Sequence, residues 1–468
     1  MKNPKPIFLC LILVISLAWN PVLSQESQAP NILVFVADDA GWRDFGCYGN
    51  DAIQTPNVDA LATGGLKMQS AFLTTPQCSP SRTSILAGEF AHTLRTEDLH
   101  TPLPAGKAIV PTYLKKQGYF SGMLMKNHLG PDGLKQFDFY DASRDESQLP
   151  ELKEFLDRSA EKPFFLWYAF GDPHRAYFEG AFTPPNDPER VKVPPYLADT
   201  ETTRKDLAMY YDEISRMDKN IGEAIAELKR RNLYQNTLII FISDNGMPFT
   251  RAKGTLYDEG IRTPLIFHWP QKLQAGVSDE LVSVLHLAPT ILDLAGATIP
   301  KSMYGKSLKG LLEGKEFEGD RYVFSERNWH DCDEHMRSVR TNKYKLIKNA
   351  YIEWPYGTAA DLAGSPSHQE LLRLKKEGKL SFPQSLVFDV PRPVIELYDV
   401  ENDPFELDNL AYDVSYRNVV QELHQVLVEW MEATDDFPPE LRRRQDNTDR
   451  VTGTHFDTRT LPPAYSNQ

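Results

Sequence analysis

Four oxygen-bearing side chains follow two apolar runs of this sequence, at the points where the runs stop. Asp38 and Asp39 come directly after "NILVFVA", and Asp244 and Asn245 come directly after "TLIIFIS". Carboxylate and amide oxygens are the ligands that a hard cation such as Ca²⁺ prefers. Either pair alone would also suit a turn or a helix cap, the usual role of Asp and Asn after a strand. Converging from two strand ends, the pairs together predict a cation site.

Basic side chains follow the ends of other apolar runs. Lys126 and His128 come after "GYFSGMLM", and their spacing would place both on one side of a strand. His174 and Arg175 come after "FFLWYAF", and Lys253 lies downstream of the second acidic pair. Each residue alone is compatible with a solvated charge or a hydrogen-bonded core histidine. As a set they predict an anion pocket beside the cation site.

One cysteine stands in a motif of its own, "CSPSR", which runs from Cys78 to Arg82. The chain has four cysteines, and Cys10 lies in an N-terminal segment that we expect to be removed. Cys47, Cys78 and Cys332 then remain, so at least one thiol of an exported protein is unpaired or chemically altered. The alternative is a buried structural thiol.

The elements that would position these residues are short apolar strands alternating with helices. The runs "NILVFVA" (31–37), "FFLWYAF" (164–170), "TLIIFIS" (237–243) and "PLIFHW" (264–269) are typical of a parallel sheet covered on both faces. The clearest helix is predicted over 204–231, where apolar residues recur every three or four positions. In such sheets, ligands gather at the carboxyl ends of the strands. The pattern predicts a doubly wound, mostly parallel α/β fold.

The sequence changes character after about residue 320. "MRSVRTNKYKLIKN" and "VIELYDVENDPFELDNLA" read as strands separated by turns, and "RNVVQELHQVLVEWMEA" reads as an amphipathic helix. The final segment of about thirty residues is polar and rich in proline, which predicts an extended surface tail. We therefore predict a catalytic domain over 28–320 and a smaller C-terminal α+β domain with its tail over 321–468.

The N-terminus and the net charge restrict location and partners. The first residues carry two lysines, an apolar run from Ile7 to Ala18 and small residues before Ser24, which predicts a signal peptide over 1–24. A membrane anchor is disfavoured because the run is short and no second run of about 18 apolar residues follows. We expect a secreted or periplasmic protein without a membrane span. The net charge of −14 disfavours nucleic acid as a partner and requires a local basic pocket for any anionic substrate.

With these motifs in place, the chain resembles the type I sulfatase family, a branch of the alkaline phosphatase superfamily. "CSPSR" and the following "TSILAG" match the family's Cys-x-Pro-x-Arg signature, and the acidic pairs match its "DD" and "DNG". A second signature, Gly-Tyr-x-Ser/Thr-x-x-x-Gly-Lys-x-x-His, is altered: Met125 stands where Gly is usual, and one residue separates Lys126 from His128. "DPHR", "SDNGMPF" and "MRSV" look most like the heparan N-sulfatase (sulfamidase) members. The resemblance covers essentially the whole mature chain and implies an alkaline-phosphatase-like fold.

The resemblance implies a metal and a modified nucleophile. The implied Ca²⁺ ligands are Asp38, Asp39, Asp244 and Asn245. A formylglycine-generating maturation enzyme would oxidise Cys78 to formylglycine (3-oxoalanine), whose hydrated diol supplies the nucleophilic hydroxyl. This chemistry would explain an exported cysteine that never pairs.

The resemblance also implies roles for the basic residues. Arg82 would orient the diol, and Lys126 and Lys253 would hold sulfate oxygens. We expect His174 to be the acid that protonates the leaving oxygen or nitrogen, and His128 to be the base that allows sulfate to leave.

The predicted substrate is a sulfated saccharide, carrying either an O-sulfate ester or an N-sulfamate. Sulfatases that resemble the sulfamidases act on glycosaminoglycans, and bacterial ones act on algal polysaccharides such as ulvan. Arg175, His330 and Asp331 are candidate substrate-binding residues, and aromatic residues in the loops 326–335 and 353–370 could stack on sugars.

Two other functions compete with this interpretation. One is a formylglycine-dependent phosphodiesterase or phosphonate hydrolase, which would share the nucleophile and the metal site. The other is a non-catalytic glycan-binding protein on a sulfatase scaffold. The second would have lost an essential residue, and the sequence lacks none.

Overall fold

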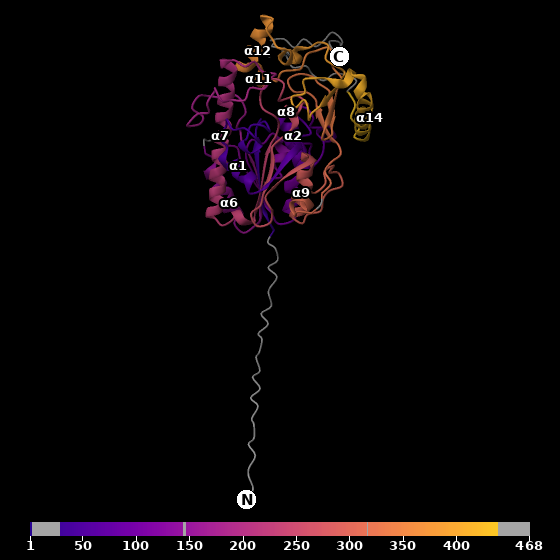
Figure 1. Cartoon of the computed structure of the whole chain (residues 1–468). Coiled ribbons are helices and arrows are strands. Elements are labelled where there is room, and N and C mark those ends of the chain that lie inside the picture. The colour runs from indigo at the N-terminus through magenta and orange to yellow at the C-terminus, as the bar shows by residue number, and fades with distance from the viewer. Residues whose placement is uncertain (2–28, 144–146, 316, 439–468) are drawn as a thin grey trace.

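An eight-stranded sheet forms the centre of the larger domain in the computed structural model (Figure 1), which describes residues 1, 29–143, 147–315 and 317–438. Its strand order is β4-β3-β5-β1-β6-β7-β2-β8. The strands are β1 (Asn31–Ala37), β2 (Leu66–Phe72), β3 (Phe120–Met125), β4 (Phe139–Asp141), β5 (Phe164–Ala169), β6 (Thr237–Ser243), β7 (Leu265–His268) and β8 (Gly276–Ser283). Apart from Met1, the predicted signal peptide lies outside the described residues, as does the predicted tail from residue 439.

Strand β1 lies inside the sheet between two parallel neighbours. Val34 is in register with Trp167 of β5 and with Ile240 of β6. Every residue of β1 and β6 is buried, as expected for strands covered on both faces. The doubly wound, mostly parallel sheet predicted from the apolar runs is therefore confirmed.

Strand β7 is the exception, because it runs antiparallel to both of its neighbours, β6 and β2. The run "PLIFHW" is a strand as predicted, but its expected parallel direction is wrong. A parallel return needs a crossover, usually a helix that runs back along the sheet. The connection from β6 instead contains only the short helix α8 (Asp258–Ile261) before the chain enters β7. Apolar composition reports burial of a strand and carries no information about its direction.

Helices cover both faces of the sheet. Alternate residues of β1 point to opposite sides, so Leu33 and Phe35 join one core and Ile32 and Val34 join the other. Helices α1, α6 and α7 lie on the first side, and α2 and α9 lie on the second (Figure 1). The helices of this domain are α1 (Pro56–Thr63), α2 (Cys78–Ala87), α3 (Ala91–Leu94), α4 (Val110–Lys115), α5 (Gly130–Leu134), α6 (Leu149–Ser159), α7 (Glu201–Arg230), α8, α9 (Leu287–Leu294) and α10 (Lys309–Leu312).

Helix α7 confirms the helix predicted over 204–231 and begins three residues earlier. Its start is set by Thr200, whose side chain accepts a hydrogen bond from the backbone amide of Thr203. The apolar face that carried the prediction, including Leu207 and Ile214, is fully buried against the sheet. Although α7 is long, no helix within the described ranges is apolar enough over a sufficient length to cross a membrane.

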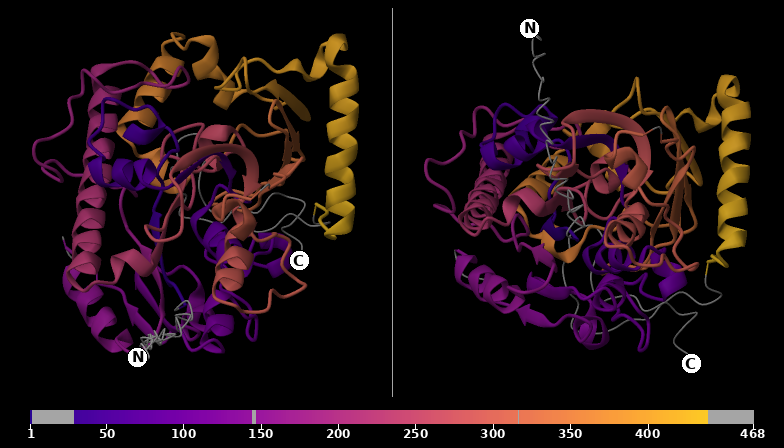
Figure 2. Two further views of the ribbon diagram at one scale, coloured as in Figure 1. Left: turned by 60° about the horizontal axis from the view of Figure 1, so that its bottom comes forward. Right: turned by 90° about the horizontal axis from the view of Figure 1, so that it is seen from below.

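The smaller domain is built on a four-stranded antiparallel sheet of order β12-β11-β10-β9, which confirms the predicted α+β module. Its elements are β9 (Val323–Arg327), β10 (Met336–Arg340), β11 (Tyr344–Asn349), α11 (Ala360–Ala363), α12 (Pro366–Lys376), α13 (Phe382–Ser385), β12 (Ile395–Asp399) and α14 (Arg417–Ala433). Helix α14 packs Leu427 and Trp430 against Val339 and Leu397 on the outer face of this sheet. Both views of Figure 2 show α14 at the outer edge of the molecule.

The segment between β11 and β12 returns to the larger domain. Leu371 of α12 is buried in the same core as the apolar face of α7. This packing places α11, which immediately precedes α12, at the carboxyl end of the central sheet, where the predicted site residues also lie (Figure 1).

Candidate active site

The two acidic pairs meet at the carboxyl ends of β1 and β6. These strands are neighbours in parallel register, so the residues that follow them are brought together. The backbone amide of Asp39 donates to Asp244 Oδ1 at 3.1 Å, and Asn245 Nδ2 donates to Asp39 Oδ1 at 2.6 Å. All four side chains, including that of Asp38, are buried. The predicted convergence is therefore observed.

The composition of this cluster fits a hard cation. One ligand atom from each of Asp38, Asp39, Cys78 and Asp244 lies within 4.8 Å of the others. Asn245 Oδ1 is buried and has no hydrogen-bond partner among the described residues, so an oxygen with free lone pairs is held beside three carboxylates. Burial raises the pKa of Asp38 above its usual value, and the neighbouring Asp244 and Asp39 add to this shift. A bound cation would relieve this repulsion.

Cys78 is the first residue of α2, and its side chain lies in the same cluster as the carboxylates. Its Sγ lies 3.6 Å from Asp39 Oδ1. Burial raises the pKa of the Cys78 thiol well above its usual value, and the nearby Lys126 and Lys253 do not compensate. The thiol is therefore held neutral, a poor nucleophile in its unmodified form.

Three buried basic side chains pair with the carboxylates of this cluster. Arg82 Nε donates to Asp244 at 2.7 Å and its Nη1 donates to the carbonyl oxygen of Lys126 at 3.1 Å. Lys126 Nζ donates to Asp38 at 2.6 and 2.7 Å, and Lys253 Nζ donates to Asp39 at 2.7 Å. Burial alone would lower the pKa of each lysine, but the adjacent carboxylates raise it above its usual value. Both lysines stay charged and can hold an anion.

Lys126 and His128 reach the cavity by a different route from the one predicted. Strand β3 ends at Met125, so the two residues do not continue a strand and the spacing rule does not apply to them. Both nevertheless line one cavity together with Asp38 and Cys78, because the chain turns after the strand. Met125 has a backbone φ of 65°, in the left-handed region that favours glycine. The turn expected of the glycine in the altered signature is thus retained with methionine.

The two histidines differ in how their nitrogens are engaged. His174 Nδ1 donates to the carbonyl oxygen of Arg175 at 2.6 Å, so Nε2 is the ring nitrogen left to interact with a ligand. That nitrogen lies 3.5 Å from Asp361 and 3.9 Å from Asp39. Burial, together with the charges of Lys126 and Arg82, lowers the pKa of His128 to about 2, and no residue in the described part of the chain forms a hydrogen bond with its Nδ1. His128 is therefore a neutral imidazole with an available lone pair.

A cavity of about 830 Å³ collects most of the predicted residues. Those that line it are Asp38, Cys78, Lys126, His128, His174, Arg175, Lys253, His330 and Asp331. Arg175 is held by two hydrogen bonds of 2.8 Å to Asp206 and one of 2.9 Å to the carbonyl oxygen of Pro248, so its role in binding substrate stays a prediction. His330 and Asp331 form a pair at 2.9 Å in the cavity lining, and their role is likewise a prediction.

The sequence pattern did not single out Asp361 or His100. Asp361 accepts a hydrogen bond from Lys253 at 2.6 Å, and the His100 ring lies 5.0 Å from that of His128. Asp361 lies within one of the loops that we expected to carry specificity, but its own surroundings, "TAADLAG", contain no motif. Only the packing of α12 on α7 brings it to the cavity.

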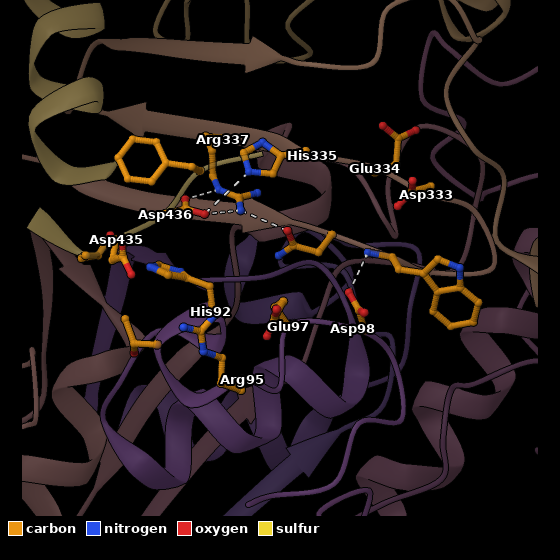
Figure 3. Close-up of a pocket in the computed structure, with 15 residues that line it drawn as sticks. His92, Arg95, Glu97, Asp98, Asp333, Glu334, His335, Arg337, Asp435 and Asp436 are labelled. Carbon is orange, nitrogen blue, oxygen red and sulfur yellow. Dashed lines mark hydrogen bonds and ion pairs between the residues drawn. The ribbon is translucent and has the colours of Figure 1, made fainter. Parts of the chain in front are cut away.

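A second cavity of about 220 Å³ lies between the two domains and contains none of the predicted site residues (Figure 3). Arg337 is bonded there to both carboxylate oxygens of Asp436, and its Nη2 donates to Asn328 at 3.0 Å. Burial raises the pKa of Asp436, but hydrogen bonds from Arg337 and His335 outweigh it and hold that pKa below its usual value. This ionic pair joins the end of α14 to the second sheet, which is a structural role.

Comparison with known proteins agrees with the motifs and the fold. A family model described as "Sulfatase" matches residues 30–297, and one described as "N-sulphoglucosamine sulphohydrolase, C-terminal" matches residues 251–377. The chain is 31% identical to human N-sulphoglucosamine sulphohydrolase over 93% of this chain and 95% of that protein. It is 30% identical to an ulvan-active sulfatase of Formosa agariphila, over 87% of this chain and 76% of that protein.

Solved structures share the fold. One, of a protein in complex with its substrate D-glucosamine-2-N,6-O-disulfate, has a TM-score of 0.70 at 20% identity and covers 88% of this chain and 99% of that one. A phosphonate monoester hydrolase of Agrobacterium radiobacter has a TM-score of 0.67 at 19% identity, covering 86% and 96%. The family model covers more than half of the chain and the human relative covers nearly all of it, so this chain belongs to the sulfatase family, among its sulfamidase-like type I members, and is a hydrolase of sulfuric esters or sulfamates.

Proposed function

We propose that this sulfatase removes sulfate from a sulfated carbohydrate, as an O-sulfate ester or an N-sulfamate, using formylglycine at position 78 and Ca²⁺. One observation carries the proposal: a single cavity brings Cys78 together with a buried carboxylate cluster, two charged lysines and two histidines. The names of the relatives, which refer to N-sulphoglucosamine and ulvan, support a carbohydrate as the substrate. The family in general uses formylglycine and a divalent metal.

The residues present suit both groups. Asp38, Asp39, Asp244 and Asn245 would hold the cation, which supplies positive charge to sulfate oxygens when it is bound. Formylglycine in its hydrated form supplies a hydroxyl nucleophile in place of the neutral thiol. Arg82 is buried between Asp244 and the backbone of Lys126 and holds the start of α2 in place beneath the cavity.

The remaining residues bind the anion and move protons. Lys126 and Lys253 present charged ammonium groups to sulfate oxygens, which offsets the repulsion between the anionic sulfate and an approaching nucleophile. His174 delivers a proton from Nε2 to the leaving oxygen or nitrogen, and the neutral His128 accepts one. Asp361, which contacts both Lys253 and His174, positions the lysine beside the acid.

We further propose that residues 1–24 are a cleaved signal peptide and that the enzyme works in the periplasm or outside the cell. The proposal rests on the two lysines, the short apolar run and the small residues before Ser24. Formylglycine at position 78 would then be made by a maturation enzyme of the producing cell.

The substrate class is tested by measuring sulfate release from a panel of defined substrates. The panel contains N-sulfoglucosamine, glucosamine 6-sulfate, sulfated ulvan oligosaccharides, p-nitrophenyl sulfate and p-nitrophenyl phosphate. We expect release from at least one carbohydrate, and a higher kcat/KM for the aryl sulfate than for the aryl phosphate, because the phosphate carries more negative charge into a site matched to sulfate. Faster phosphate hydrolysis would favour the phosphodiesterase alternative. The non-catalytic alternative is disfavoured, because every predicted catalytic and metal-binding residue lines the cavity or is hydrogen-bonded within the carboxylate cluster.

Ca²⁺ binding is tested by thermal unfolding, which does not depend on activity. Ca²⁺ at 100 times its dissociation constant should stabilise the folded protein by about 2.7 kcal/mol and raise Tm accordingly. Asp244→Asn removes one ligand charge and should lose most of this increment. Asp132→Asn, which changes an exposed carboxylate on α5, should keep all of it. An equal Ca²⁺-dependent rise in wild type and Asp244→Asn would overturn the metal assignment.

A further inference from the structure

One end of the large cavity is lined by residues that the proposed mechanism does not use. Asp172 and Phe178 come from the loop after β5, and Glu213 and Arg216 come from successive turns of α7. Arg216 donates to both oxygens of Asp172, at 2.7 and 2.9 Å, and pairs with Glu213. The guanidinium also lies 5.1 Å from the centre of the Phe178 ring. Segments that are distant in sequence thus build one polar cluster with an aromatic cover.

The exposure of these residues is unusual for an ion-pair cluster. Phe178 is 57% exposed although it borders a cavity, whereas Glu213 beneath it is only 2% exposed. Glu213 Oε1 is buried and receives no hydrogen bond from the described residues. An apolar ring open to solvent beside a hydrogen-bonding cluster suits a ligand with one apolar face and a polar edge. A pyranose ring has this form, with C–H groups on its faces and hydroxyl groups around its edge.

The protonation state of Glu213 extends its hydrogen-bonding capacity. Burial, and then the charge of Asp172, raise the pKa of Glu213 to about 8. At neutral pH it therefore keeps a proton, which a hydrogen bond with Asp172 favours, and its buried Oε1 can accept a hydrogen bond from a sugar hydroxyl. The charge of Arg216 is then balanced by that of Asp172.

The loop that carries Asp172 and Phe178 also carries the proposed acid for the leaving group. The carbonyl oxygen of Asp172 accepts a hydrogen bond from the backbone amide of Asp38 at 2.9 Å, which ties this loop to the carboxylate cluster. His174, the proposed acid for the leaving atom, is two residues further along the same loop. A sugar attached to the departing oxygen or nitrogen would extend toward Phe178 and Arg216.

We propose that Asp172, Glu213, Arg216 and Phe178 form the subsite for the sugar ring that carries the sulfate, with Phe178 against one face of the ring and the polar cluster on its hydroxyl groups. This inference rests on the proposed function and adds which residues select a carbohydrate over another sulfate ester. An aryl sulfate lacks the hydroxyl groups that the cluster would bind. The subsite therefore controls the ratio of kcat/KM for sugar sulfate to kcat/KM for p-nitrophenyl sulfate.

The test compares two subsite variants with two matched controls. Phe178→Ala and Glu213→Ala should each lower that ratio by at least about tenfold, measured with the best carbohydrate of the panel. Phe382→Ala removes a similarly exposed ring, 66% exposed, that does not line the cavity. Glu227→Ala removes another glutamate side chain of α7 that is paired with an arginine three residues later, Arg230, outside the cavity. Both controls should keep the wild-type ratio, and thermal unfolding checks that all four variants fold.

The outcomes separate this inference from the proposed function. An unchanged ratio in both subsite variants, with wild-type carbohydrate activity present, overturns the subsite and leaves the function standing. If the wild type hydrolyses p-nitrophenyl sulfate but no carbohydrate sulfate, the proposed function fails and a binding measurement decides the subsite. Unsulfated D-glucosamine should then inhibit aryl sulfate hydrolysis competitively, and Phe178→Ala should raise its inhibition constant by about tenfold, the size of effect that loss of a specific pocket contact has. No inhibition, or the same constant in the variant, would overturn the subsite.

Discussion

Cys78→Ala should reduce sulfate release by roughly 10⁶-fold, the size of effect seen when a hydrolase loses its nucleophile. Cys78 begins α2 with its Sγ 3.6 Å from Asp39, and it lines the cavity beside Lys126 and Lys253. No other cysteine lines that cavity, so nothing among the described residues can replace it. Burial holds the unmodified thiol neutral by raising its pKa, so activity should also require the modification. Mass spectrometry of active enzyme should find position 78 lighter than cysteine by about 18 Da, the difference between the thiol and the aldehyde.

The control for this variant is Cys47→Ala, which removes a partly buried thiol outside the cavity. It should retain wild-type activity, and mass spectrometry should still find formylglycine at position 78. Cys78→Ala itself should fold, because the loss of one small buried side chain costs about 1 kcal/mol. Full activity in a preparation whose Cys78 is entirely unmodified would refute the formylglycine mechanism while leaving the family assignment intact.

His174→Ala should separate substrates by the quality of their leaving groups. A sugar alkoxide or amine must be protonated as it departs, whereas p-nitrophenolate leaves without a proton. General acid catalysis contributes about 10²–10⁴-fold, so kcat/KM for a carbohydrate sulfate should fall by that factor and the value for p-nitrophenyl sulfate should fall much less. The geometry supports the assignment, since Nδ1 is held by the carbonyl oxygen of Arg175 and Nε2 faces the cavity.

Two further histidine variants test this assignment. His128→Ala should lower kcat for the two substrates by the same factor, because a base that assists the release of sulfate acts after the leaving group has gone. His424→Ala changes a histidine of α14 far from the cavity lining and should have no effect on either substrate. Equal losses on carbohydrate and aryl sulfates in His174→Ala would mean that another group supplies the proton, and His174 would then have only a binding role.

Local patterns in the sequence were sufficient to predict the strands and the polar residues that follow them. The runs at 31–37 and 237–243 are strands with these bounds, and both are buried on two faces, as uninterrupted apolar composition requires. Asp38 and Asp244 follow these strands directly, and parallel neighbours end at the same edge of a sheet. The convergence of these carboxylates could therefore be predicted from one sequence.

Local patterns were not sufficient to predict the direction of a strand or the conformation of a loop. The run at 264–269 is as apolar as the others, yet β7 is antiparallel, because its direction depends on the path of the preceding loop. Lys126 and His128 share the cavity through a turn at Met125, whose φ of 65° is not encoded by an alternating pattern. Conformations of this kind depend on the contacts that the loop makes in the folded protein.

Short sequence motifs specified the proposed chemistry: the candidate nucleophile at Cys78, the candidate oxygen ligands and the basic residues that follow strand after strand. Which of these groups are in contact, and which residues surround them, depends on how distant segments pack in the folded protein. Asp361 contacts Lys253 across 108 residues of sequence, because α12 packs on α7, and Phe178 covers Arg216 because a loop folds back over the same helix. A short motif can be recognised from neighbouring residues in the sequence. Contacts between distant segments depend instead on how apolar faces pack, which no single stretch of residues specifies.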